Sequence, residues 1–167
     1  GQGYNSFTML QVAHAMGNVA NNGLKMKPHL VREVLDVETK ASTPVAKEPI
    51  GQLSLAPENL EIIKKGMIGV NIEGTSATSF VGAQYVSAGK TGTAQVFTVK
   101  QNEKYNAATI DERMRDHALF VAFAPADDPK VALAMVVENA GFGAQNAAPI
   151  ARRVFDFVIM GQYPSQE

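Results

Sequence analysis

The sequence predicts an α+β fold in which helices flank an antiparallel sheet. Two dense apolar runs, 118–124 and 131–137, are separated by the turn sequence Pro-Ala-Asp-Asp-Pro, which is typical of a connection between antiparallel strands. Near both ends of the chain, apolar residues recur at the three- and four-residue spacings of amphipathic helices. The chain has 167 residues, of which 46% are hydrophobic, enough for a buried core without disulfides. We therefore expect one folded unit.

The first helix is predicted over residues 9–20. Thr8 can cap its start, and the Asn-Asn-Gly sequence at 21–23 is typical of a helix end. Alternating apolar residues over 30–37 then predict a short strand or strand pair. The stretch 40–51 is rich in Ser, Thr, Pro and Lys and lacks periodicity, so we expect a surface connection there.

The Pro-Glu pair that opens residues 57–70 predicts a second helix with an acidic first turn. Residues 84–99 predict a long strand, although it contains Gly89 and Gly92. Glycine inside a strand often marks the close approach of a ligand or of another backbone. This strand is therefore the first candidate for a binding surface.

Residues 100–116 are polar and too numerous for a tight hairpin, so we expect a solvated excursion between paired strands. Because long loops often carry function, docking of a partner or substrate is the alternative. The 118–124 and 131–137 runs are both expected to be buried on both faces. A last helix is predicted over 147–160, with an apolar stripe toward the sheet that consists of Ile150, Val154, Phe157 and Val158.

Composition and charge exclude several classes of function. Fifteen Lys and Arg residues are balanced by 16 Asp and Glu residues, so the chain lacks the basic field that binds nucleic acid. Without cysteine it has no thiolate nucleophile and no disulfide. Its apolar runs are far shorter than the roughly 20 residues of a membrane-spanning helix. The first residue is Gly1 rather than Met, and we expect a piece of a longer protein.

The stretch 87–95, Ser-Ala-Gly-Lys-Thr-Gly-Thr-Ala-Gln, is the main candidate for chemistry. On a strand, alternate side chains share a face, so Lys90 is expected on one face and Thr91 and Thr93 on the other. Gly92 has no side chain and allows a ligand to lie against the backbone. Such a strand at the edge of a sheet can bind an extended peptide.

Three interpretations compete for this stretch. A phosphate-binding P-loop requires a glycine five residues before the Gly-Lys pair, and Gln84 stands there instead, so spacing excludes it. The simplest alternative is a strand with one exposed lysine. The third is the Lys-Thr-Gly element of the penicillin-recognising serine enzymes.

Neither a metal nor a cofactor is predicted. His14, His29 and His117 have no metal-ligand spacing, and we expect each of them to be structural. The Gly-Phe-Gly sequence at 141–143 lacks the third glycine of a dinucleotide-binding fingerprint, so we attribute it to loop geometry.

The order of the elements favours the third interpretation: a long strand, an excursion, an antiparallel strand pair and a C-terminal helix. Several motifs agree with it in order: Gly1-Gln2-Gly3-Tyr4 with Thr8 and Gln11, Glu73-Gly74-Thr75, Ala88 to Gln95, His117 to Pro125 and Glu138 to Gly143. On these motifs the chain resembles the class B penicillin-binding proteins over almost its whole length. The resemblance implies the C-terminal part of a beta-lactamase/transpeptidase-like fold.

The resemblance implies a peptidoglycan D,D-transpeptidase. In this family a serine attacks a D-Ala-D-Ala stem peptide, releases D-Ala and passes the acyl group to an amine, and beta-lactams acylate the same serine. Lys90 would set the electrostatics of the site, while the hydroxyls of Thr91 and Thr93 would hold the donor's terminal carboxylate. The backbone N–H of Thr93 would donate to the oxyanion. The resemblance also implies the periplasmic face of the bacterial inner membrane, an anchor outside this chain, and partners in the cell-elongation machinery.

Two motifs of the family are missing. No Ser-x-Asn occurs in the chain, and Ser87 and Lys90 spell Ser-x-x-Lys on a strand, where they would face opposite sides. We therefore expect residues 1–167 to be the C-terminal half of a transpeptidase domain, inactive alone because the nucleophile is absent. The strand 131–138 would then lie open for the missing half of the domain or for another chain.

Other functions share the same strand. A serine beta-lactamase or a D,D-carboxypeptidase would use Lys-Thr-Gly in the same way but would transfer the acyl group to water. A non-catalytic sensor module would use the cleft without chemistry. Covalent labelling by a penicillin separates these alternatives.

Overall fold

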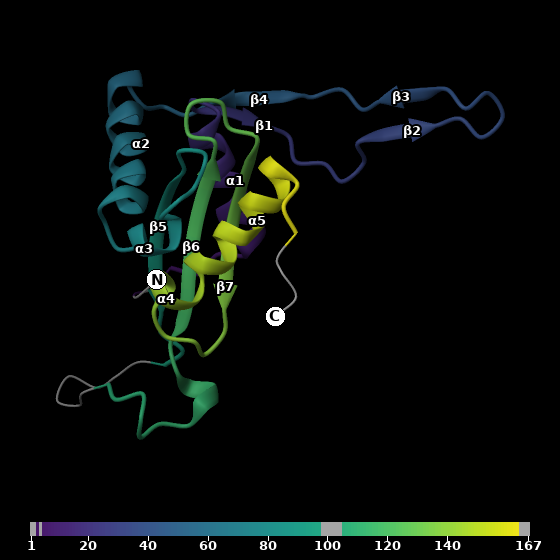
Figure 1. The fold of residues 1–167 in the computed structure, drawn as a ribbon. Helices are drawn as coiled ribbons and strands as arrows, with labels where there is room; N and C mark the ends of the chain where they lie inside the picture. Colours follow the sequence, from purple (N-terminus) through teal and green to yellow (C-terminus); the bar gives the residue numbers. More distant parts are fainter. Residues whose placement is uncertain (1–2, 4, 98–104, 164–167) are drawn as a thin grey trace.

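The computed structural model describes residues 3, 5–97 and 105–163. A three-stranded antiparallel sheet forms its centre, in the order β5 (Ala88–Ala94), β6 (His117–Ala124), β7 (Val131–Val137). Helix α1 (Met9–Ala20) covers one face of β6 and β7, and helix α5 (Ala148–Met160) lies across the other face (Figure 1). The predicted α+β class with helices on an antiparallel sheet is confirmed.

Strand β6 supplies both halves of the core because its side chains alternate between the two faces. Four small or aromatic residues of β6, among them the fully buried Phe120, pack against Phe155 of α5 and Phe80. On the opposite face, Phe123 packs against Ala20 of α1 and Met67. The central position of β6 explains why its apolar run is nearly continuous.

Helix α1 confirms the predicted bounds and cap. The Thr8 side chain accepts a hydrogen bond from the backbone N–H of Gln11, whose side chain accepts from the backbone N–H of Thr8. This capping box satisfies two donors that the helix itself leaves unpaired. The Asn-Asn-Gly turn at 21–23 follows as predicted.

Helix α2 (Pro57–Ile72) confirms the second predicted helix and extends slightly beyond it. It continues through Gly66 and Gly69 because its buried side chains, including Leu60 and Met67, stabilise it by packing. The short helix α3 (Ala77–Phe80) follows at once. Together they bring the segment 71–80 beside β5.

The connection predicted over 40–51 lies on the surface as expected, but two strands that were not predicted run through it. This segment holds β3 (Ser42–Pro44) and β4 (Pro49–Gln52), which pair with β2 (Glu33–Leu35) and β1 (Leu24–Met26) respectively. The ribbon of β2 and β3 extends away from the sheet and its helices (Figure 1). Strand β2 confirms the short strand predicted over 30–37. Every residue of β3 and β4 is exposed, so neither face imposes the hydrophobic alternation that reveals a strand in a sequence.

The strand predicted over 84–99 is shorter, because β5 begins at Ala88 and ends at Ala94. Before it, Tyr85 and Ser87 face other elements and bond to Asp156 and Asn71 instead of joining the ladder. The last residues of the prediction, 98–99, lie outside the described residues. The described part of the 100–116 excursion, 105–116, is a loop with a 3-10 turn at Glu112–Met114, and its first five residues lie outside the described range.

The stripe predicted to bury α5 is also wrong. Its buried residues are Ala148, Ala151 and Phe155, whereas the predicted stripe is exposed, with Phe157 44% accessible. Alanines let the helix approach the sheet closely, and Arg152 and Asp156 turn inward to bind polar groups there. The expectation that 131–137 is buried on both faces fails as well, because β7, like β5, is an edge strand of the described sheet and is only half-buried.

No helix in the described part of the chain is both long enough and apolar enough to cross a bilayer.

Candidate active site

The four predicted site residues, Lys90, Thr91, Gly92 and Thr93, all lie on β5 at the edge of the sheet. Lys90 is opposite Val121 in the register, whereas Thr91 is opposite Phe120. Since Phe120 faces α5, the two threonines lie on the α5 side and Lys90 on the α1 side, as predicted.

A cleft of about 730 Å³ opens beside this part of β5. It is formed by three segments: β5 itself, the turn after α2, and the loop that leads into α4 (Gly143–Asn146). Its lining consists of Thr75, Lys90, Thr91, Gly92, Thr93, Phe142, Gly143, Ala144 and Gln145. Three hydroxyls and an ammonium group within a cleft of this size can bind a carboxylate.

Gly143 lies in one wall of the cleft and contacts the backbone of the sheet directly. A Cβ at this position would lie 2.0 Å from the Leu119 carbonyl oxygen and 2.7 Å from that of Gly92. No L residue fits at such distances, so glycine lets this loop lie against β5. The Gly-Phe-Gly sequence at 141–143 indicated loop geometry, and in the structure this loop forms one wall of the cleft.

Thr75 was missed as a site residue. Its Oγ1 lies 2.9 Å from the Oγ1 of Thr91, and both residues line the cleft. The only signal in the sequence was its place in the Glu-Gly-Thr motif of the resemblance. A contact across 16 residues cannot be read from spacing alone.

Lys90 is exposed, and its ammonium group donates to the Thr91 carbonyl oxygen at 2.7 Å. It also borders a second hollow, of about 540 Å³, on the α1 side of the sheet. The rest of that lining is mostly apolar and includes Phe7, Val12 and Leu119. Lys90 thus stands between a polar cleft and an apolar hollow.

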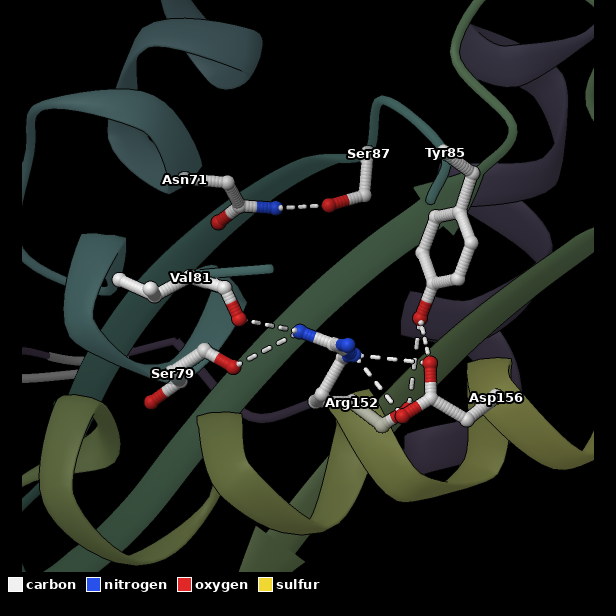
Figure 2. A network of polar contacts seen from close by, with 7 residues as sticks. All are labelled: Asn71, Ser79, Val81, Tyr85, Ser87, Arg152 and Asp156. Atoms are coloured by element: carbon white, nitrogen blue, oxygen red, sulfur yellow. Dashed lines mark hydrogen bonds and ion pairs between the residues drawn. The ribbon is translucent and has the colours of Figure 1, made fainter. Parts of the chain in front are cut away.

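Ser87 is not placed as a nucleophile. It is 3% exposed, precedes β5, and its hydroxyl accepts a hydrogen bond from Asn71 Nδ2 at 2.9 Å (Figure 2). Ser87 and Lys90 are therefore a chance match to Ser-x-x-Lys, as the strand geometry predicted. The histidines likewise bond to backbone, with His14 Nε2 2.8 Å from the Met26 carbonyl oxygen.

We expect Ser87→Ala in the full-length protein to keep covalent labelling by penicillin at the wild-type stoichiometry. Loss of the buried hydrogen bond to Asn71 should lower the free energy of unfolding by about 1–3 kcal/mol. Intact-mass spectrometry after incubation with penicillin measures the labelling. An unlabelled but folded variant would mean that Ser87 carries the acyl group.

A polar network behind the cleft ties α5 to the segment that leads into β5 (Figure 2). Arg152 donates to the carboxylate of Asp156 and to the Val81 carbonyl oxygen, and the Tyr85 hydroxyl donates to Asp156 at 2.7 Å. Burial, followed by this bond to the carboxylate, raises the pKa of Tyr85 well above its usual range. The Tyr85 phenol therefore stays protonated and keeps its hydrogen bond to Asp156.

Comparison with known proteins identifies the family of this chain. The family model "Penicillin binding protein transpeptidase domain" matches residues 1–156. The chain belongs to this family. The family resemblance that the motifs predicted is therefore confirmed.

The named relatives are peptidoglycan enzymes. The chain is 41% identical over 170 residues to the peptidoglycan D,D-transpeptidase MrdA of Haemophilus influenzae, covering 100% of this chain and 26% of the relative. It is 38% identical over 164 residues to MrdA of Escherichia coli K12, covering 96% of this chain and 25% of that relative. The chain thus spans about a quarter of the length of these curated relatives.

Solved structures of the family share the fold. Penicillin-binding protein 2 of Pseudomonas aeruginosa, crystallised with WCK 5153, superposes with a TM-score of 0.74 at 33% identity, covering 99% of this chain and 33% of that one. The imipenem acyl-enzyme of penicillin-binding protein A from Mycobacterium tuberculosis gives a TM-score of 0.75 at 28% identity, with 95% and 32% covered. The predicted transpeptidase-like fold is confirmed, and the chain covers part of that domain.

Proposed function

We propose that the full-length protein is a peptidoglycan D,D-transpeptidase and that residues 1–167 are the C-terminal half of its transpeptidase domain. One observation carries the proposal: an edge strand presents Lys90 on one face and two threonine hydroxyls toward a cleft on the other. A stem peptide ends in a carboxylate, and hydroxyl and ammonium donors are the groups that bind one. The names of the relatives support the reaction class.

In this mechanism the extended donor peptide lies along β5, with its terminal carboxylate at Thr91 and Thr93. A serine from the other half of the domain attacks the carbonyl carbon of the penultimate D-Ala, and the peptide N–H of Thr93 donates to the oxyanion. The C–N bond breaks, and the leaving D-Ala amine takes a proton. An acceptor amine then displaces the serine and restores its hydroxyl. Lys90 stabilises the negative charge that approaches the site.

Three surfaces support the proposal that another part of the domain covers this half. In the described residues the outer edge of β7 has no partner strand, and the apolar stripe of α5 is exposed. The hollow beside Lys90 is mostly apolar. Open strand edges and large apolar patches are rare on complete soluble domains. We expect the N-terminal half of the domain, with the nucleophile, to cover them.

The same proposal places the domain on the periplasmic face of the inner membrane, where peptidoglycan is assembled, with an anchor outside this sequence. Its partners would be proteins of the cell-elongation machinery. The naming of the relatives as peptidoglycan enzymes supports this location.

A fluorescent penicillin tests the function directly. We expect the purified full-length protein to form one stable covalent adduct, and the isolated chain of residues 1–167 to form none, because it lacks the nucleophile. An adduct that hydrolyses within seconds would indicate a beta-lactamase or carboxypeptidase instead. A folded full-length protein with no adduct would indicate a sensor module and would refute the proposal.

Replacing Thr91 by Val in the full-length protein should lower the rate constant of acylation by about tenfold, because a hydrogen bond to a charged group is lost. Valine keeps the shape of the side chain, so the strand should be unchanged. Stopped-flow fluorescence gives the rate constant. Unchanged acylation would remove Thr91 from carboxylate recognition.

A further inference from the structure

Thr75 lies outside the Lys-Thr-Gly strand, yet it faces the same cleft. It belongs to the turn between α2 and α3, and its Oγ1 is 2.9 Å from the Oγ1 of Thr91. Both side chains line the cleft, next to Gly92 and Thr93. The Thr75 hydroxyl is therefore a hydrogen-bond neighbour of the Thr91 hydroxyl, which is proposed to bind the substrate.

Buried hydrogen bonds hold the turn that carries Thr75 against β5. The fully buried Ser76 donates to Asn71 Oδ1 at 2.7 Å. Asn71 Nδ2 in turn donates to Ser87, one residue before β5 begins, at 2.9 Å, the bond drawn in Figure 2. Asn71 and Ser87 are themselves buried. Buried and satisfied polar networks of this kind specify one arrangement of the elements they join.

Two glycines allow this close packing. A Cβ at Gly89 would lie 2.5 Å from the Phe120 ring and 3.0 Å from Asn71 Oδ1, so β5 runs directly against the amide of Asn71. A Cβ at Gly74 would lie 2.6 Å from the Cα of Val70, so the turn folds tightly onto the end of α2. The position of Thr75 relative to Thr91 is thus set by backbone packing and not by a free loop.

The hydroxyl of Thr91 carries one proton and accepts through its lone pairs. When Thr91 donates to a carboxylate, that proton is committed, and its oxygen can only accept from Thr75. When Thr91 instead donates to Thr75, no proton remains for the carboxylate. The direction of this one hydrogen bond decides whether Thr91 can bind the substrate.

We propose that Thr75 is a positioning residue for carboxylate recognition: it donates to Thr91 Oγ1 and so directs the Thr91 proton into the cleft. The ligand class is a peptide or beta-lactam that ends in a free carboxylate. The inference rests on the proposed function and extends it to a residue outside the Lys-Thr-Gly strand.

The test uses the full-length protein with Thr75→Val, Thr75→Ser and the control Thr78→Val. Thr78 is exposed, lies three residues further along, and does not line the cleft. We expect Thr75→Val to slow acylation by benzylpenicillin about three- to tenfold, the loss of one hydrogen bond, and to leave the rate with its methyl ester nearly unchanged. Thr75→Ser should restore the wild-type rate, and Thr78→Val should not differ from wild type.

A double-mutant cycle with Thr91→Val separates positioning from direct contact. In the Thr91→Val background, Thr75→Val should cause no further loss, because its effect passes through Thr91. A full additional loss would show that Thr75 binds the carboxylate itself and would overturn the proposal. So would a wild-type rate for Thr75→Val, or an equal loss with the ester. If the wild-type protein is not acylated, the proposed function fails first and the inference with it.

Discussion

Replacing Lys90 by Ala in the full-length protein is expected to reduce the rate constant of acylation by a penicillin about 10²- to 10³-fold, the range found when one preorganised electrostatic contact is removed from an active site. The Lys90 ammonium group is the only positive charge on β5, and Lys90 lines both the cleft and the apolar hollow. Without it, negative charge developing in the transition state has one stabilising group fewer. Stopped-flow measurement with a fluorescent penicillin gives the rate constant.

Lys65→Ala is the matched control for this prediction. Lys65 is exposed on α2 and does not line the cleft, so its removal changes the net charge equally without touching the site. We expect its acylation rate to match wild type. Equal losses in both variants would mean that Lys90 acts only through overall charge, and a wild-type rate for Lys90→Ala would exclude it from the site.

The second large effect is expected from Gly143→Ala. The new Cβ would lie 2.0 Å from the Leu119 carbonyl oxygen, and neither backbone can yield without breaking the packing of the loop on β5. We expect a loss of about 3 kcal/mol in the free energy of unfolding, as in severe overpacking. Because the same loop walls the cleft, acylation should fall as well. Thermal unfolding and acylation kinetics measure the two effects.

Gly66→Ala is the control. Gly66 lies on an exposed position of α2, and a Cβ there meets no atom within 4 Å. Alanine favours a helix over glycine by about 1 kcal/mol, so this variant should be slightly more stable than wild type and equally active. If Gly143→Ala proves as harmless as Gly66→Ala, the close contact between the loop and β5 does not exist in solution.

The elements that could be predicted well are those whose buried residues recur at the spacing of a helix or a strand. Thr8 and Gln11 form a cap that is local in sequence, and the apolar run of β6 reflects its central place in the sheet. Strand β2 lies within the strand predicted over 30–37, whereas β3 was missed because it is exposed on both faces and its sequence carries no apolar alternation. On α5, the four residues of the predicted apolar stripe are exposed, whereas Phe155 and two alanines are buried, because the small alanines allow close approach to the sheet.

The site divides in the same way. The faces of Lys90, Thr91 and Thr93 could be predicted because these residues lie on one strand, where side chains alternate between the two faces. The roles given to them and to Gly92 stay predictions. Thr75 and the loop at 143 reach the cleft through tertiary contacts, and periodicity carries no information on those. The structure alone shows the 2.9 Å contact between the Thr75 and Thr91 hydroxyls and the close approach of Gly143 to β5.

A crystal structure of the full-length protein acylated by a penicillin tests most directly whether β5 binds the carboxylate of the ligand. We expect the carboxylate of the bound drug within hydrogen-bond distance, about 2.5–3.0 Å, of the hydroxyls of Thr91 and Thr93, and the ester carbonyl oxygen at the Thr93 N–H. An adduct whose carboxylate is held by other residues, with β5 turned away from the drug, would contradict it.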